Sequence, residues 1–227
     1  MHTGAHGDGH SEERWPVFST GQAANEANWD HDALENIPMS TMIFLKIGWM
    51  EKYAGLNGDT IWSRSKFIRE HGYGHEIFNN MPYKGHVYGY VQANDSQTID
   101  ISRLGDSNSE ASINDVLVIW VSAAREGGVY VVGWYKHATV YRSWQPTPGD
   151  PRRKYRTETI GYNVKARTKD CTFLKEDSRF SLRLKVPGTM RRASVWYACK
   201  PEHRKFKQGV LKFINTHPSA EGHCFAK

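Results

Sequence analysis

Apolar runs separated by short polar segments characterise the chain from residue 42 onward. Residues 42–47 form a short apolar run, and residues 116–121 form a continuous one. We expect the first to be a strand and the second to be a strand buried on both faces. Residues 129–135 follow a Gly-containing turn at 126–128, so the two runs around this turn predict a β-hairpin.

The second strand of this hairpin has two unusual positions. Gly133 lies inside the strand, where a glycine predicts a bulge or a close approach by another backbone. Lys136 and His137 interrupt the apolar pattern. We therefore expect a break at these two residues, followed by a further strand at residues 138–141.

Two helices are expected within this strand-rich pattern. Residues 63–70 predict a short helix, with Ser63 as its N-cap. Pro201 precedes a final helix at residues 202–215, whose apolar residues recur at helical spacing. The apolar residues of its buried face are Phe206, Val210, Leu211 and Ile214.

The remaining β-like segments complete a fold that is mainly β, of the α+β class. They are residues 86–92, 98–101, 162–166, 180–186 and 194–198. Many short strands with one or two short helices and a C-terminal helix predict a small closed or nearly closed barrel. A β-sandwich is the alternative, and the helix after the first strand makes it less favourable.

The pattern divides the chain into three parts. Residues 1–40 lack sustained periodicity and are predicted to be an acidic, partly disordered extension. Residues 41–200 form the predicted barrel domain, and residues 201–227 form a basic C-terminal helix and tail.

Charge is distributed unevenly along the chain, whose net charge is +6. Residues 142–227 contain 20 Lys and Arg against 7 Asp and Glu, whereas residues 1–40 contain 1 against 7. A strongly cationic side suits a polyanionic partner such as nucleic acid. A solvated basic face is the alternative interpretation.

The 3 cysteines and the apolar content bear on localisation. A sparse, odd set of cysteines argues against a disulfide framework and indicates a reducing compartment, so we predict a cytoplasmic protein. No segment approaches the ~18 apolar residues needed to cross a bilayer. The polar N-terminus lacks the apolar core of a secretory signal.

Residues 131–142, with the sequence VVGWYKHATVYR, are the most distinctive run. They follow a strand, a polar loop with a short helix, a Gly-rich aromatic strand and an apolar strand. In this order the region of residues 42–200 resembles the PUA-like superfamily, which includes the EVE, ASCH and YTH domains. More narrowly, it is similar to modules joined to HNH nuclease domains in bacterial modification-dependent restriction proteins.

The resemblance implies a small barrel with an aromatic-walled pocket that accepts one nucleobase. It also implies recognition of modified bases in DNA or RNA by base flipping, in a restriction or bacterial defence context. This chain lacks an HNH arrangement with paired CxxC motifs. A reader without a nuclease would act alone or recruit an effector nuclease on a separate chain.

A base pocket needs flat side chains for stacking and polar groups for the base edge. The stacking candidates are Trp49, Trp62, Trp134 and Tyr135, although Trp134 and Tyr135 point to opposite faces of one strand. The polar candidates, which lie in loops that can approach a ligand, are Asn57, Asp59, His75, Glu76 and Asn79. Core packing or helix capping is the alternative role for each of them.

Phosphate contacts require a track of cationic side chains, because backbone neutralisation supplies most of the affinity. Four candidates lie beside a Pro/Gly loop, and the others lie on a strand, on a second basic run and on the final helix. The predicted track is Arg142, Arg152, Arg153, Lys154, Arg156, Arg191, Arg192, Arg204 and Lys205. Solvated basic loops are the alternative interpretation.

Catalytic motifs are not apparent in the sequence. No HExxH, P-loop or GxSxG pattern occurs, and we expect neither a metal nor another cofactor. The adjacent pair His75-Glu76 could serve as a base and its partner, but such a pair is unspecific. A metal-dependent nuclease with an unfamiliar site is therefore kept as an alternative.

The sequence thus predicts a non-enzymatic DNA-binding protein that recognises a modified base by flipping it into an aromatic pocket. An RNA-binding PUA-like protein is the second hypothesis. Binding to duplexes with and without 5-methylcytosine separates these two, whereas metal-dependent cleavage would identify the nuclease.

Overall fold

The computed structural model describes residues 41–56, 58–63, 66–93, 98–105, 111–184 and 193–217. The strands of its main sheet are β1 (Met42–Ile47), β2 (Pro82–Tyr83), β3 (His86–Gly89), β4 (Ser112–Ala123), β5 (Val129–Gln145), β8 (Tyr162–Arg167), β9 (Cys171–Phe173), β10 (Arg183–Leu184) and β11 (Val195–Trp196). A separate two-stranded hairpin consists of β6 (Lys154–Tyr155) and β7 (Glu158–Thr159). The fold is therefore mainly β, as the sequence predicted.

Helical segments are few and short. The α-helices are α2 (Lys66–His71), α3 (Glu176–Arg179) and α5 (Arg204–Thr216). Short 3-10 helices lie at His75–Phe78, Ile101–Leu104, Thr168–Asp170 and Pro201–His203.

The nine strands form one mixed sheet with the order β11-β1-β4-β5-β8-β3-β2, and β9 and β10 pair with β5. β1 runs parallel to β4, with Met42 opposite Leu117 and Ile47 opposite Ser122. Parallel pairing is possible because a long connection separates the two strands in sequence. Among the described residues, no pairing joins β2 to β11, so a closed barrel is not shown.

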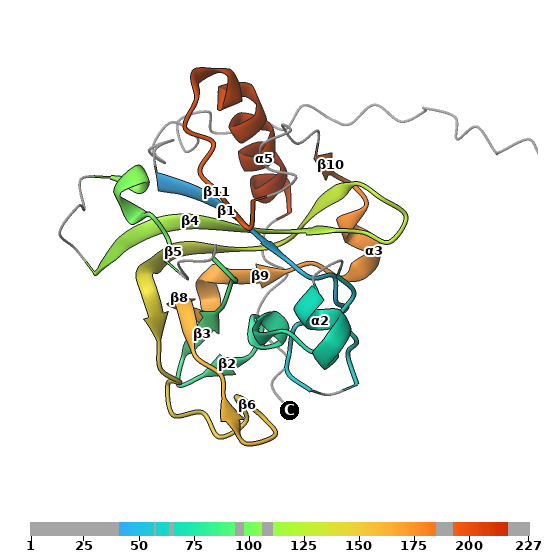
Figure 1. Cartoon of the computed structure of the whole chain (residues 1–227). Helices are drawn as coiled ribbons and strands as arrows, with labels where there is room; N and C mark the ends of the chain where they lie inside the picture. Colours follow the sequence, from blue (N-terminus) through green and yellow to red (C-terminus); the bar gives the residue numbers. More distant parts are fainter. Residues whose placement is uncertain are drawn as a thin grey trace, which may run out of the picture.

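The predicted hairpin forms the centre of the sheet (Figure 1). β4 and β5 pair antiparallel from Ser112–Tyr141 to Ala123–Val129. The apolar run at residues 116–121 is buried throughout, which confirms a strand covered on both faces. The first strand is confirmed with its predicted bounds.

The expected break in the second strand of the hairpin is wrong. β5 continues through His137, which takes a positive φ of 50°, opposite an irregular part of β4 where Asp115 has a φ of 57°. A local distortion therefore replaces the predicted interruption. The prediction for Gly133 is confirmed, since a Cβ at this position would lie 2.5 Å from the carbonyl oxygen of Thr172 in β9.

Each face of the sheet packs against its own hydrophobic cluster. One cluster contains Leu45, Trp120 and Tyr135 and extends into the loops after β1 and around β3. The other lies between the sheet and α5, where Phe44 and Trp134 of the sheet meet Ile214. Figure 1 shows α5 on one side of β1 and β4, with α2, β2, β3 and β6 on the other.

Other elements differ from the prediction. The expected strand at 98–101 is wrong, because a 3-10 helix occupies Ile101–Leu104. The expected strand at 180–186 contains only β10 within the described residues, and α3 precedes it. The two predicted helices are present as α2 and α5, and Val210, Leu211 and Ile214 of α5 are buried as expected.

No helix in the described part of the chain is long and apolar enough to cross a membrane. The proposed extension at residues 1–40 lies outside the described residues.

Candidate functional site

An open cleft of about 1720 Å³ lies where the ends of β1 and β4 meet α2, the segment at residues 73–76 and the β6–β7 hairpin. Trp144 at the end of β5 and Arg183 of β10 also line it. The cleft brings together segments that are far apart in sequence.

Three tyrosines, a histidine and a carboxylate form a connected group at this cleft. The Tyr73 hydroxyl donates to Glu158 Oε2 at 2.7 Å, and His75 Nε2 lies 3.6 Å from Glu158 Oε1. The Tyr73 ring stacks on Tyr155 with a centroid distance of 3.5 Å, and the His75 ring lies 4.9 Å from that of Tyr90. Glu158 and Tyr155 belong to the β6–β7 hairpin, so these contacts hold the hairpin against the cleft.

The surroundings of this group favour the neutral forms of His75 and Tyr73. Burial is the main cause that lowers the pKa of His75, and the nearby Glu158 opposes that shift. Burial, together with the hydrogen bond to Glu158, raises the pKa of Tyr73 to about 12. His75 is therefore a neutral imidazole at neutral pH, and Tyr73 keeps its hydroxyl proton.

Glu76 is a second carboxyl group of the cleft. Its Oε1 accepts a hydrogen bond from the Gly48 backbone N–H at 3.1 Å. Burial raises its pKa, and the hydrogen bonds from backbone N–H groups only partly offset that effect. Among the ion pairs of the described residues, none involves Glu76.

Aromatic side chains make up much of the cleft wall. Trp62, Tyr73 and Tyr90 line it, and Trp144 does so with 44% of its surface exposed. The Trp144 ring occupies the space above Gly161, where a Cβ would lie 2.3 Å from the ring. The cleft therefore offers flat side chains next to hydrogen-bonding groups.

Three of the predicted base-pocket residues, Trp62, His75 and Glu76, line this cleft. Trp49 and Asp59 instead line a smaller hollow of about 370 Å³, which also includes Trp62. The Trp49 indole N–H donates to Glu176 at 2.7 Å, and only 7% of the residue is exposed. Trp49 is therefore mainly a core residue.

Asp59 and Asn79 have local structural roles. Asp59 accepts hydrogen bonds from the backbone N–H groups of residues 51–53 and so holds their loop. Asn79 is fully buried and exchanges two hydrogen bonds with the backbone of Tyr90. The prediction that Asn79 contacts a base is wrong, because its side chain is 0% exposed and its amide is hydrogen-bonded to the Tyr90 backbone.

Trp134 and Tyr135 are also corrected. Both are buried, Trp134 against Phe213 of α5 and Tyr135 against Trp120 in the opposite cluster. Their opposite directions follow from the alternation of side chains along a strand. Neither ring can stack on a ligand, because the protein core covers both.

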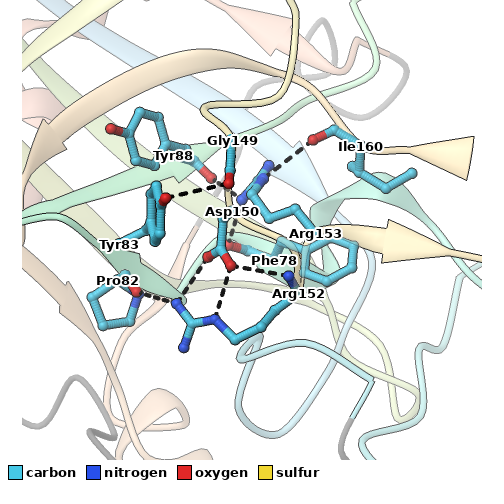
Figure 2. A network of polar contacts seen from close by, with 9 residues as sticks. All are labelled: Phe78, Pro82, Tyr83, Tyr88, Gly149, Asp150, Arg152, Arg153 and Ile160. Carbon is cyan, nitrogen blue, oxygen red and sulfur yellow. Dashed lines mark hydrogen bonds and ion pairs between the residues drawn. The ribbon is translucent and has the colours of Figure 1, made fainter.

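Arg153 was predicted to contact phosphate, and this is wrong because its side chain is 0% exposed. Its guanidinium donates to the carbonyl oxygens of Phe78, Tyr88, Ile160 and Gly161 at 2.8–3.2 Å. Figure 2 shows most of these contacts. Burial lowers the pKa of Arg153 to about 10, so the group stays charged at neutral pH.

The neighbouring basic residues Arg152, Lys154 and Arg156 are all exposed. Arg152 donates to both oxygens of Asp150 and to the Pro82 carbonyl oxygen, as Figure 2 shows. Lys154 and Arg156 are exposed on the β6–β7 hairpin, whose Glu158 lines the cleft. They therefore lie on an element that borders the cleft.

Two further members of the predicted track lie on a different element from this hairpin. Arg204 and Lys205 are exposed on α5, which lies across the sheet from β6 (Figure 1). Arg142 is half-buried on β5, and its backbone N–H donates to the carbonyl oxygen of Ala111. Three predicted site residues lie outside the described residues, namely Asn57, Arg191 and Arg192.

Sequence reasoning missed several cleft residues. Tyr73 belongs to the Gly-rich run 72–79, whose density of polar groups was the available signal. Tyr90, Trp144 and Glu158 lie on three separate segments, and no sequence spacing connects them. Only the pairing of β3, β5 and β8 brings these segments together.

Among the described residues, no set of three His, Cys, Asp or Glu side chains is grouped so that it could hold a metal ion. The nuclease alternative gains no support from this arrangement.

Comparison of the chain with protein-family models, curated proteins and solved structures finds no match. The cleft and its lining residues are therefore the features of the protein that bear on its function.

Proposed function

We propose that this protein binds DNA and holds one extruded base, including a modified base, in the cleft beside Trp62 and Trp144. A PUA-like architecture, in which the curled sheet acts as a small barrel around the base site, is part of this proposal. The observation that carries it is the combination of aromatic walls with the hydrogen-bonding groups of His75 and Glu76 in one open cleft.

The chemistry of the cleft matches the needs of an extruded base. A base outside the helix must regain the stacking energy that it loses, and aromatic side chains supply ~1–3 kcal/mol for each base. Its polar edge must also find hydrogen-bonding partners, because unpaired polar groups are costly in a partly dry site. Trp62 and Trp144 can provide the first, and Glu76 can provide the second.

The size of the cleft favours a polymer segment over a small metabolite. Typical small-molecule pockets enclose about 300–1,000 Å³, and this cleft is larger and open, at about 1720 Å³. Such a space can take a nucleotide together with its adjoining backbone. Lys154 and Arg156 near the rim would neutralise the flanking phosphates.

Fluorescence anisotropy with labelled duplexes tests this proposal. Duplexes with and without 5-methylcytosine are compared with single-stranded RNA at one low salt concentration, since affinities depend on salt. We expect DNA to bind, and 2-aminopurine placed at the test position to brighten when it leaves the stack. Tight RNA binding with no DNA binding would favour the RNA alternative, and no binding to either would reject the proposal.

Replacing Trp144 tests the role of the cleft itself. We expect Trp144→Ala to weaken binding by roughly 5- to 150-fold, which corresponds to the loss of one stacking contact of ~1–3 kcal/mol. The midpoint of urea unfolding should change little, because much of the ring is exposed. Phe180→Ala removes a similarly exposed aromatic ring outside the cleft and should leave the affinity unchanged.

A further inference from the structure

The carboxyl group of Glu76 is held in a fixed position by backbone on two sides. Gly48 donates its N–H to Oε1. On the other side, a Cβ on Gly74 would lie 2.3 Å from Oε2 and 2.8 Å from Cδ, so the carboxyl group fills the space that a side chain there would need. The position of Glu76 is therefore built into the fold and does not depend on a flexible surface rotamer.

Two other side-chain acceptors that line the cleft already accept hydrogen bonds. Glu158 accepts from Tyr73 and lies next to His75, and Gln92 accepts from the Tyr90 hydroxyl at 2.6 Å. An ionised carboxylate has about four acceptor positions, and backbone N–H groups take only some of those on Glu76. Glu76 thus retains capacity to accept hydrogen bonds from a ligand in the cleft.

Glu76 forms no ion pair within the described residues, so its free acceptor positions favour a ligand that donates hydrogen bonds. Cytosine, adenine and guanine each carry an exocyclic amino group, whereas thymine and uracil present carbonyl oxygens instead. A carboxylate facing a carbonyl oxygen would leave both acceptors without a hydrogen atom between them, and a group left unsatisfied in a partly buried site is penalised.

We infer that Glu76 is the specificity-determining residue of the cleft and selects bases that carry an exocyclic amino group over bases that lack one. This inference rests on the proposed function, because it assigns the substrate class of the same cleft. Glu76 would accept the N–H of the amino group while the aromatic walls hold the ring.

The matched probes are 5-methylcytosine and thymine, which share the ring and the methyl group but differ in the amino group and the N3 proton. Each is placed opposite an abasic site in otherwise identical DNA duplexes, so that neither base pays for a broken base pair. Binding is measured by anisotropy at pH 8, which favours the ionised carboxylate. We expect the 5-methylcytosine duplex to bind at least about tenfold more tightly, the effect of one hydrogen bond to a charged group.

Glu76→Gln is the decisive variant. A glutamine amide both donates and accepts, so it can pair with either base, and we expect the two affinities to come within about threefold of each other. Glu202→Gln, the same change at an exposed residue next to α5, should leave the wild-type ratio unchanged. A purely structural role for Glu76 would weaken binding to both duplexes and preserve their ratio.

Gly74→Ala provides a second variant in which Glu76 itself is kept. Gly74 has a φ of −140°, which any residue can adopt, so alanine should displace the carboxyl group without straining the backbone. We expect the same loss of preference as in Glu76→Gln, while the urea unfolding midpoint confirms that the protein is folded.

The outcomes separate this inference from the proposed function. Equal wild-type binding of the two probes, or a preference that survives in Glu76→Gln, would overturn the role of Glu76 and leave base binding intact. If neither base improves binding over a duplex with an abasic site on both strands, the proposed function fails, and this inference fails with it.

Discussion

At the scale of single residues, two buried arginines connect distant segments of this protein. Arg153 and Arg179 are both fully buried, and both donate to backbone carbonyl oxygens. Arg153 joins the loop before β6 to β3, and Arg179 joins α3 to the loop after β1. Each guanidinium donates to several backbone carbonyl groups from segments distant in sequence, so the charge serves the fold.

The adjacent residues Arg153 and Lys154 allow a matched test of this role. Arg153→Ala would remove a donor from each of four carbonyl groups, of which Phe78 keeps the Met81 N–H, and a buried carbonyl left unsatisfied costs ~1–3 kcal/mol. We expect the free energy of unfolding in urea to fall by about 3 kcal/mol or more. Lys154→Ala, at an exposed position, should change it by less than ~0.5 kcal/mol. Equal effects of the two substitutions would contradict the structural role.

Glu76 predicts a specific pH dependence of stability. Its folded pKa lies above the unfolded value of 4.5 because of burial, so the folded state holds the proton to higher pH. Stability from this group is therefore fully present below about pH 4.5 and is lost as the pH rises through the higher folded pKa. The lowered pKa of His75 acts in the opposite direction around its ordinary value of 6.5.

Glu76→Gln isolates this contribution. We expect the variant to be stabilised relative to wild type at pH 8 by more than it is at pH 4.5, because only wild type loses stability over this range. Urea unfolding of both proteins across the range measures the difference, from which the unchanged His75 contribution cancels. A difference that does not vary with pH would show that burial does not perturb Glu76.

At the scale of elements, β5 is the strand on which the sheet depends. It pairs with β4 along one edge and with β8, β9 and β10 along the other. β9 pairs with β5 so closely at Gly133 that a Cβ there would meet the carbonyl oxygen of Thr172. The lack of space for a side chain explains why residue 133 is a glycine, and the sequence prediction of a close approach there was correct.

The buried Gly133 and the exposed Gly209 should respond in opposite ways to alanine. We expect Gly133→Ala to lower the unfolding midpoint, with a cost of about 1–3 kcal/mol from the forced shift of β9. Gly209 lies within α5, where a Cβ would meet nothing within 4 Å. Gly209→Ala should raise stability by ~0.5–1 kcal/mol. Thermal or urea unfolding measures both, and a neutral Gly133→Ala would contradict the close contact.

The β6–β7 hairpin and α5 carry exposed basic residues on different sides of the sheet (Figure 1). If the cleft binds DNA, the hairpin cations should contact phosphate. Replacing Lys154 and Arg156 together by alanine should lower the slope of log affinity against log salt by about 2, since each phosphate contact contributes ~0.9. The reduction should be similar for all DNA sequences.

The double alanine variant of Arg204 and Lys205 is the control for this measurement. It removes the same charge from α5, across the sheet from the hairpin. We expect its salt slope to match that of wild type. A larger effect from α5 than from the hairpin would place the phosphate contacts on the opposite side of the molecule.

At the scale of the whole molecule, the sheet separates two hydrophobic clusters and leaves the cleft at its border. The cluster beneath α5 seals one face, and the cluster beneath the loops after β1 and around β3 fills the other. The cleft lies where these loops meet the ends of β1 and β4. Its rigidity follows from the packed core beside it, and its polar groups come from loops that the core positions.

The sequence predicted the main strands because burial on a sheet imposes a local pattern. The runs in β1 and β4, the hairpin turn before β5 and the apolar face of α5 follow from side-chain periodicity, which is a property of neighbouring residues. It failed at residues 98–101, where Ile99 donates one backbone hydrogen bond to Arg142 of β5 but no strand forms, and Ile101 begins a 3-10 helix.

The sequence by itself determined a mainly β fold, a C-terminal helix with one buried face, and a concentration of positive charge in the last third. Only the tertiary structure decided which polar residues are available to a ligand. Arg153 and Lys154 are adjacent and both positively charged. The buried guanidinium of Arg153 donates to backbone carbonyl groups, whereas Lys154 is exposed to solvent. Exposure and hydrogen-bond partners depend on contacts between residues distant in sequence, and no local pattern encodes them.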